Sequence, residues 1–184
     1  MAINEWMSWE GGVDVAGFTA SGLAMPNVIV HVARVVHTPV GSAPAGMIFW
    51  QPDPKAAPVL AGFVCTDATV GGYFGPKIFA GTPFEKAPLL AARIAVCVDL
   101  PNAVASRIDV AGHVFEVTLT GLGTPELVHR AAGSPMPFVQ QGVEASAAKA
   151  EVKVDGKVIA VTIPPVGLGG GPAAVWAPTG VYAR

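Results

Sequence analysis

The fold is decided by the stretch Arg107-Ile-Asp-Val-Ala-Gly-His-Val-Phe-Glu-Val-Thr-Leu119. Its central Ala-Gly pair predicts a two-residue hairpin loop, which sets Arg107 opposite Glu116 on neighbouring antiparallel strands. In that register one face of the hairpin is apolar and consists of Ile108, Val110, His113, Phe115, Val117 and Leu119. The other face carries Arg107, Asp109, Glu116 and Thr118. A hairpin with one apolar face covers one side of a hydrophobic core.

A second hairpin and several shorter runs extend the same pattern. Residues Glu151–Ile163 centre on Asp155-Gly156, and both of these residue types accept the positive φ angles of a type I′ turn. Runs rich in Val, Ile, Phe and Thr, separated by Gly and Pro, predict further strands at Val13–Thr19, Met47–Gln51, Val59–Thr66, Lys77–Ala80, Leu89–Asp99 and Ala174–Tyr182. The start of Leu89–Val98 also suits a helix, but its later apolar residues alternate, and we favour a strand.

The run Asn27–His37 is apolar on both of its faces. One face carries Val28, Val30, Val32 and Val36 with Arg34, and the other carries Ile29, Ala33 and Val35 with His31 and His37. A strand of this kind is covered on both sides. We expect the second cover to be another layer of strands or another subunit.

Helix signals occur at three positions. Thr124-Pro125-Glu126 opens a segment that Gly133 closes, with the capping residue, the proline and the acidic residue in their preferred places. Thr82-Pro83-Phe84-Glu85 has the spacing of a capping box, and Pro88 limits that helix to about one turn. Val143–Ala150 is the third candidate.

Together these elements predict a single, mostly β domain over residues 1–184. We expect an antiparallel β-barrel or a two-sheet sandwich with one or two short helices. A chain of this length buries about 70% of the surface that its unfolded form exposes, which is enough for a sizeable core.

The composition is poor in charge for so apolar a chain. Charged residues make up 13% and hydrophobic residues 52% of the sequence, and the mean hydropathy is +0.52, whereas an average soluble domain is about 25% charged. We therefore expect the excess apolar surface to lie inside the protein, between copies of it or around a ligand. The net charge of −2, without a basic cluster, argues against nucleic-acid partners and polybasic membrane attachment.

Targeting signals and membrane spans are not recognisable in the sequence. The first residues lack the basic and apolar regions of a secretory signal. The longest apolar runs, such as Val28–Val36, contain a charged residue and are too short to cross a bilayer. We therefore expect a cytoplasmic protein without membrane contact, in which Cys65 and Cys97 are small buried hydrophobic residues.

Several polar patterns suit structural roles better than chemistry. His31 and His37 share a strand face but lie roughly 20 Å apart, which is too far for one metal ion. Glu126 and His129 have helical i, i+3 spacing, but two-metal bundles need that pair twice. Gly167–Pro172 lacks the Gly-Lys-Ser/Thr sequence of a phosphate loop, and we expect a turn there. We therefore expect neither a metal ion nor a cofactor.

The stretch best suited to a ligand runs from Thr66 to Phe84, where glycines are mixed with aromatic residues. A loop of this composition can fold over a pocket, although its phenylalanines are equally suited to plugging one end of a core. Its candidate catalytic or ligand-orienting side chains are Asp67, Tyr73 and Lys77. His113 is the fourth candidate, because it lies at the turn end of the apolar face of its hairpin.

Two functions stay open on the sequence alone. The first is binding of a small apolar or weakly polar molecule in a cavity at one end of the barrel, with or without turnover by cofactor-free isomerase or lyase chemistry. The second is a structural or scaffolding role, in which the excess apolar surface forms subunit interfaces. We expect a homo-oligomer in both cases. The residues do not decide whether the protein is an enzyme.

Overall fold

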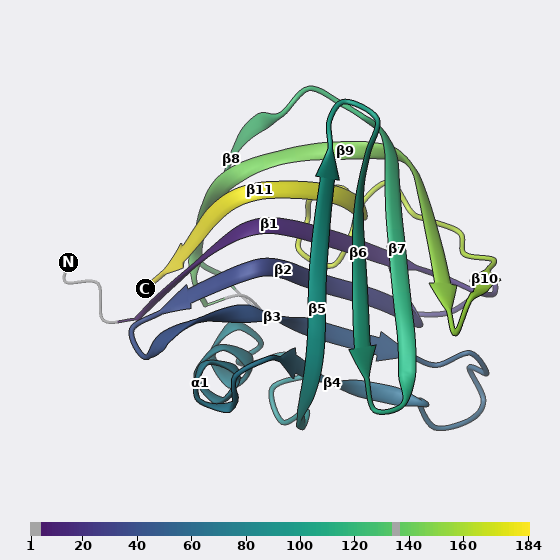
Figure 1. Ribbon diagram of the computed structural model, residues 1–184, viewed down its shortest axis with the longest axis horizontal. Coiled ribbons are helices and arrows are strands. Elements are labelled where there is room, and N and C mark those ends of the chain that lie inside the picture. The colour runs from purple at the N-terminus through teal and green to yellow at the C-terminus, as the bar shows by residue number, and fades with distance from the viewer. Residues whose placement is uncertain (1–4, 134–136) are drawn as a thin grey trace.

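Within residues 5–133 and 137–184, which the computed structural model describes, the chain forms eleven strands and one helix. They are β1 (Trp6–Gly17), β2 (Val28–Thr38), β3 (Gly41–Trp50), β4 (Leu60–Cys65), α1 (Ala68–Ile78), β5 (Leu89–Asp99), β6 (Ala103–Val110), β7 (His113–Leu122), β8 (Glu126–Arg130), β9 (Val139–Val154), β10 (Lys157–Ile159) and β11 (Ala174–Ala183). Nine of the strands close a ring in the order β9-β11-β1-β2-β3-β4-β5-β6-β7, because β7 also pairs with β9 (Figure 1). The predicted mostly β, barrel-like fold is confirmed.

The ring consists of two crossing layers. In Figure 1, β5, β6 and β7 run in front of β1, β2, β3, β9 and β11 at a steep angle. Neighbouring strands of the ring are antiparallel except β4 and β5, which are parallel and are joined through α1. A parallel pair needs such a crossover, because a tight hairpin joins only antiparallel strands.

The interior of the ring is filled with side chains. Its buried residues, each no more than 2% exposed, include Val13, Val15, Val28, Val30, Val32, Ile108, Phe115 and Leu119. These residues occupy alternate positions along their strands, as a barrel wall requires. The barrel is therefore held together by a packed core.

Both predicted hairpins are confirmed, with the expected register. Arg107 pairs with Glu116 across β6 and β7, and their side chains form an ion pair with an Nη1–Oε1 distance of 3.1 Å. Positive φ angles occur at both loop residues in each hairpin, namely 50° and 83° at Ala111 and Gly112 and 53° and 76° at Asp155 and Gly156. The two-residue loops have the backbone geometry that the sequence predicted.

The two apolar faces of β2 are both covered by the chain itself. Val28, Val30 and Val32 face the interior of the barrel. On the other face Ala33 packs against residues of α1, and Ile29 packs in a cluster with Phe79 and Phe84. This strand therefore gives no reason to expect a second subunit.

Three predicted helices are wrong. The segment Thr124–Gly133 contains β8, which pairs with β9 along Glu126–Arg130, and Val143–Ala150 lies within β9. Thr82–Glu85 forms turns, in which the Glu85 carboxylate accepts a hydrogen bond of 2.8 Å from the Gly81 amide. Capping residues show where a helix can begin, but a short helix also needs an apolar face to bury. The residue that would supply it in the first segment, Leu127, is 88% exposed.

Helix α1 lies where the sequence predicted a loop followed by a strand at Lys77–Ala80. The Asp67 carboxylate begins the helix by accepting hydrogen bonds from the amides of Thr69 and Val70. The helix buries Val70, Phe74 and Ile78 on one face. A Cβ atom at Gly75 would overlap the ring of Phe63 on β4. The glycine that favoured a loop reading is therefore what lets the helix lie close against the sheet.

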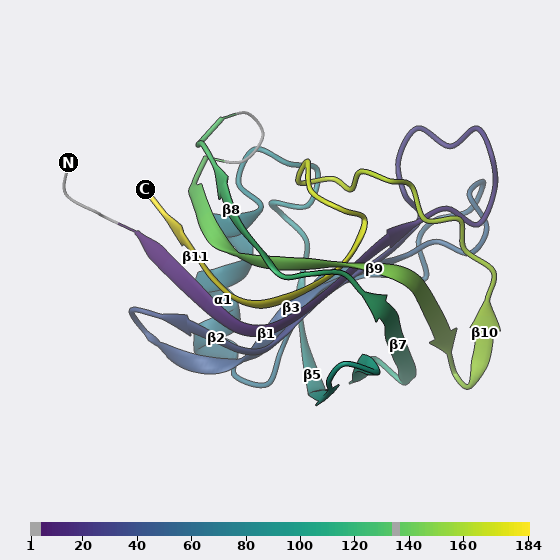
Figure 2. The same ribbon diagram turned by 90° about the horizontal axis from the view of Figure 1, so that it is seen from above.

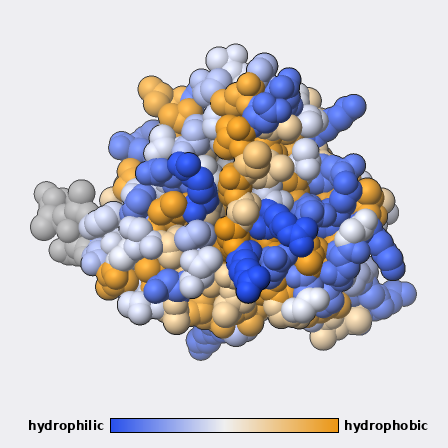
Figure 3. Space-filling model, viewed as in Figure 1, coloured by the Kyte–Doolittle hydropathy of each residue, from blue (hydrophilic) through white to orange (hydrophobic). Residues whose placement is uncertain are grey.

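Strand β5 is a strand, as predicted, and it presents apolar residues to solvent. Leu89, Val98 and the neighbouring Leu100 are 37%, 45% and 50% exposed. Figure 3 shows hydrophobic residues following the course of this strand between hydrophilic patches. The prediction for the cysteines is correct for Cys65, which is buried, and wrong for Cys97, which is exposed on β5.

Candidate functional site

A cavity of about 340 Å³ lies against the outer face of the barrel wall. Its floor is formed by β1, β2, β3, β9 and β11, and its cover by residues 78–84, β8 and residues 167–173. In Figure 2, β8 and the segment that leads into β11 lie on the opposite side of the sheet from β5 and β7. The lining is chiefly apolar and includes Ile29, Met47, Phe79, Phe84 and Leu168. The cavity thus lies outside the packed interior of the barrel.

One side of the cavity carries a group of polar residues from five strands. This polar wall consists of Asp14 on β1, His31 on β2, Arg130 on β8, Gln140 and Glu144 on β9, and Tyr182 on β11. Successive residues of a strand point to opposite faces of a sheet. The valines that flank Asp14 and His31 in sequence therefore fill the barrel, while these two polar side chains reach the cavity.

Asp14 and His31 lie directly opposite each other on β1 and β2. The Asp14 carboxylate pairs with Nδ1 of His31, which leaves Nε2 available for another partner. Although the ring lies deep in the molecule, 34% of the His31 side chain is exposed. Burial opposes protonation of the ring, but the charge and hydrogen bond of Asp14, helped by the charge of Glu144, outweigh it and raise the pKa of His31 above 6.5.

Arg130 and Glu144 form a bidentate ion pair in the same wall. The two Nη–Oε distances are 2.6 and 2.7 Å, and only 9% of the Glu144 side chain is exposed. Gln140 donates a further hydrogen bond of 3.2 Å to the same carboxylate. The guanidinium is therefore already engaged by a carboxylate of the chain.

Tyr182 brings a phenol to the polar wall. Its ring packs against Trp9, with 4.8 Å between ring centroids. Burial, together with the negative charges of Asp14 and Glu144, strongly raises the pKa of the Tyr182 hydroxyl, and Arg130 opposes this only in part. The hydroxyl is therefore a neutral hydrogen-bond donor.

The cover of the cavity is tied to the polar wall at one point. The glycine-rich segment 167–172 is a turn, as predicted, and is closed by a hydrogen bond of 2.8 Å from the Gly167 amide to the Gly171 carbonyl. A Cβ atom at Gly171 would overlap Nη2 of Arg130 and lie 2.9 Å from Oε2 of Glu144. A side chain at this position would displace the ion pair, so the glycine lets the backbone of the cover rest against it.

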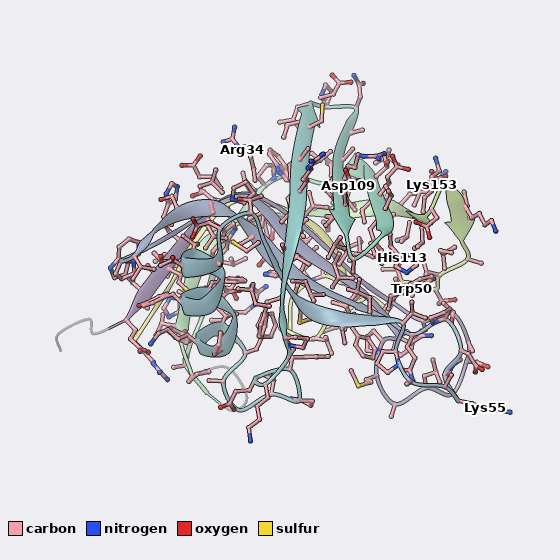
Figure 4. The ribbon with its side chains drawn as sticks, turned by 60° about the horizontal axis from the view of Figure 1, so that its bottom comes forward. Arg34, Trp50, Lys55, Asp109, His113 and Lys153 are labelled. Carbon is pink, nitrogen blue, oxygen red and sulfur yellow. The ribbon has the colours of Figure 1, made fainter. Side chains whose placement is uncertain are left out.

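The structure places the predicted site residue His113 at the end of the barrel, outside the cavity lining. Its ring packs against Trp50, with 5.6 Å between centroids, at the end of the molecule far from α1 (Figure 4). Its Nδ1 lies 2.8 Å from the Asp155 carboxylate. That hydrogen bond, with one from the Val114 amide, lowers the pKa of Asp155.

The other three predicted site residues belong to α1 or its cap, and they also lie outside the cavity lining. Asp67 is the capping residue of the helix. Lys77 and Tyr73 lie together, with the Lys77 Nζ 4.8 Å from the centre of the Tyr73 ring. Lys77 also pairs with Glu5. The Lys77 hydrogen bond, partly opposed by burial and assisted by Arg184, holds the pKa of Glu5 below its ordinary value.

The predicted aromatic stretch does reach the cavity through its final residues. Ile78, Phe79, Thr82, Pro83 and Phe84 contribute to the lining, and the ring of Phe79 meets His31 edge-on at 6.3 Å. His31 was predicted to have a structural role. Asp14, Arg130 and Glu144 were not predicted as site residues, because each lies on a different strand from its partner. Asp14 and His31 could have been found by pairing the polar positions of two strands that are otherwise apolar on the same face.

In residues 5–133 and 137–184, no three or more His, Cys, Asp or Glu side chains are grouped so that they could hold a metal ion. In the same residues no helix has the length and apolar character needed to cross a membrane.

Comparison with other proteins does not assign the chain to a group. No model of a known protein family matches it, and no curated protein sequence matches it either. Its function is therefore argued from the cavity and the polar wall.

Proposed function

We propose that the protein binds a small, mainly apolar molecule with an uncharged hydrogen-bonding end in the cavity between the barrel wall and its cover. The cavity volume of about 340 Å³ lies within the range of roughly 300–1,000 Å³ that small-molecule sites occupy. The apolar lining favours a hydrocarbon body by removing it from water. The polar wall supplies the few groups that orient such a ligand.

The observation that carries this proposal is that the charges of the polar wall are paired with each other. Arg130 uses two nitrogens on Glu144, and His31 uses one on Asp14. A carboxylate ligand would have to displace one of these carboxylates or lie beside both, at an electrostatic cost. A ketone or an alcohol avoids that cost, since it can bond to His31 or Tyr182 without adding charge.

Displacement of a fluorescent dye tests the proposal. The neutral dye 1-aminoanthracene is expected to bind and to brighten as it leaves water. The neutral ketone 2-tetralone should displace it, whereas tetralin-2-carboxylate, which has the same skeleton and a negative charge, should displace it at least tenfold less effectively. Equal displacement by the two compounds would contradict the argument from paired charges.

A pair of alanine variants locates the dye. Ala16 is buried and lines the cavity, so Ala16→Leu places three extra carbon atoms there and should weaken dye binding. Ala91 is exposed on β5, outside the cavity lining, and Ala91→Leu should leave dye binding unchanged. If circular dichroism shows both variants folded and both bind the dye as the parent does, the ligand site lies elsewhere.

A structural homo-oligomer is the second proposal, and it rests on a different observation. The exposed apolar residues Leu89, Val98 and Leu100 lie on and beside β5, and a second copy seated there would remove them from water. Sedimentation at micromolar concentration should then show a mass above that of the 18.7 kDa chain. A single species of 18.7 kDa would rule this proposal out.

A further inference from the structure

The Asp14–His31 pair has the arrangement of a base and its orienting carboxylate, placed at an apolar cavity. The Asp14 carboxylate engages Nδ1 of His31, which assigns the proton of the neutral ring to Nδ1 and leaves a lone pair on Nε2. The edge-on contact with Phe79 limits how the ring can turn. The contact with Asp14 therefore favours the tautomer whose basic nitrogen is Nε2.

The chain has four histidines, and only His31 lines the cavity. His37 lies on the same strand, but its two ring nitrogens meet Ser42 and Glu10 at 2.8 and 3.2 Å. His113 is bound to Asp155 at the end of the barrel. His129 meets Gln141 at 3.1 Å on the exposed surface. Three of the four histidines therefore meet a carboxylate, and His31 differs from the other two in that it lines the cavity.

We propose that the cavity is a proton-transfer site for enolisable ketones, in which Nε2 of His31 removes a proton from the carbon next to the carbonyl group and the Tyr182 hydroxyl bonds the carbonyl oxygen. This inference rests on the proposed binding function. It makes His31 and Tyr182 catalytic residues and Asp14 a positioning residue.

The step balances within the ligand and one side chain. The C–H bond breaks, its proton moves to Nε2, and its electron pair forms a C=C bond while the carbonyl π electrons move onto oxygen. The proton on Nε2 then exchanges with solvent, so that delivery of a solvent hydrogen from Nε2 to the same carbon completes the exchange. Delivery to another carbon of a conjugated ketone gives an isomer. The step needs no oxidant or reductant.

The charges around His31 favour the protonated form that this step produces. Asp14 on β1 and Glu144 on β9 face His31 and make it a stronger base, as its raised pKa shows. Arg130 on β8 is neutralised by Glu144. The lining residues from α1 and the segment after it, Ile78, Phe79, Thr82, Pro83 and Phe84, bring no charge.

Tyr182 supplies the second group that the step requires. The negative charge that develops on the carbonyl oxygen must be stabilised by a donor that is already in place. The raised pKa of Tyr182 keeps its hydroxyl protonated, and none of the described side chains occupies that hydroxyl with a hydrogen bond. The phenol is therefore free to donate to a ligand.

The test follows hydrogen–deuterium exchange of 2-tetralone in D₂O by proton NMR, with the protein at known occupancy from dye displacement. The parent protein should exchange the C1 protons faster than buffer alone. His31→Gln should reduce this excess rate by about 100-fold, the scale of a lost general base, while still displacing the dye. Tyr182→Phe should also slow exchange.

The matched control is His37→Gln. His37 also lies on β2 and pairs with a carboxylate of β1, namely Glu10, but it does not line the cavity. This variant should exchange 2-tetralone as the parent does. A loss equal to that of His31→Gln would overturn the assignment of the base.

The pH profile tests the role of Asp14. Exchange should rise with pH as His31 loses its proton, with an inflection above 6.5, the ordinary value of a histidine. Asp14→Asn removes the charge that favours protonation, so the inflection should move to lower pH and the limiting rate should fall. An unchanged inflection would refute a positioning role for Asp14.

The outcomes separate this inference from the binding proposal. If 2-tetralone displaces the dye but exchanges at the rate of buffer alone, the cavity binds ketones and the proton-transfer inference is wrong. If 2-tetralone does not displace the dye from the folded parent protein, the proposed binding function fails and the inference fails with it.

Discussion

Replacing Arg130 with methionine tests the energetics of the polar wall, because it keeps most of the side-chain length and removes the charge. The change breaks two hydrogen bonds of 2.6 and 2.7 Å and leaves the carboxylate of Glu144, whose side chain is 9% exposed, with only Gln140 at 3.2 Å. Removing one partner of a buried ion pair costs about 3–5 kcal/mol. Since 26% of the Arg130 side chain is exposed, we expect the low end, about 3 kcal/mol.

The control is the second cross-strand arginine–glutamate pair, Arg107 and Glu116. Their closest nitrogen–oxygen distance is 3.1 Å, and their side chains are 53% and 37% exposed. An exposed pair contributes at most about 1 kcal/mol, so Arg107→Met should cost no more than that.

Urea denaturation measures both free energies of unfolding. A loss of about 3 kcal/mol corresponds to a drop of about 6–12 °C in melting temperature for a chain of this size. The double variant Arg130→Met/Glu144→Gln should recover part of the loss, because it leaves no buried carboxylate without its partner. If Arg130→Met costs no more than Arg107→Met, the description of the Arg130–Glu144 pair as buried and mutually dependent is wrong.

Three further predictions concern the barrel, the cover and the histidine. Phe115→Ala should lower the free energy of unfolding, measured by urea denaturation, by about 3–5 kcal/mol, because the ring is fully buried. Glu116→Ala should lower it by at most about 1 kcal/mol. The opposite ranking would contradict the hairpin register. Gly171→Ala should lower the free energy of unfolding by about 1–3 kcal/mol through overpacking. The same change should cost less in a protein that already carries Arg130→Met. If the cost of Gly171→Ala is the same in both backgrounds, the ion pair is not what the new methyl group contacts. Because folding raises the pKa of His31, its protonated form contributes stability that is fully present below pH 6.5 and is lost as pH rises through the folded value. His31→Gln should flatten that part of the pH–stability curve, and a curve that keeps its slope would place the titrating group elsewhere.

The barrel could be predicted from the sequence because its signals are local. Two-residue loops such as Asp155-Gly156 fix the register of their strands, and alternation then assigns each side chain to a face. The barrel closes through β7 and β9, which meet across residues far apart in sequence, so the order of its strands could not be read from any one stretch.

Helix α1 and strand β8 show why local signals failed elsewhere. Gly75 favoured a loop, but it allows a close contact with Phe63 that only the folded sheet supplies. Thr124 and Pro125 favoured a helix, but the edge of β9 offers Glu126–Arg130 a full set of strand partners. In both cases a distant strand decided the local conformation.

The candidate site was harder to predict than the barrel. His31 is visible in the sequence as a polar residue on an apolar strand, but the carboxylate that contacts its ring belongs to Asp14 on a different strand. Arg130 lies next to Glu144 because β8 pairs with β9. Asp67, Tyr73 and Lys77 lie on α1 or its cap, whereas His113 lies at the far end of the barrel, so the four residues do not form one site.

Strand β2 contributes Val28, Val30 and Val32 to the packed interior of the barrel. It also contributes Ile29 and His31 to the cavity lining. A ligand seated on this strand cannot keep its binding surface once the barrel opens, so its binding energy is linked to global unfolding. The segment 167–173, by contrast, precedes β11 and lies outside the strands of the ring, and segments of this kind can open without global unfolding. A bound ligand should therefore slow amide exchange of the deepest β2 hydrogens as well as that of the cover, and the protection of β2 becomes a measure of occupancy that needs no knowledge of what the ligand is.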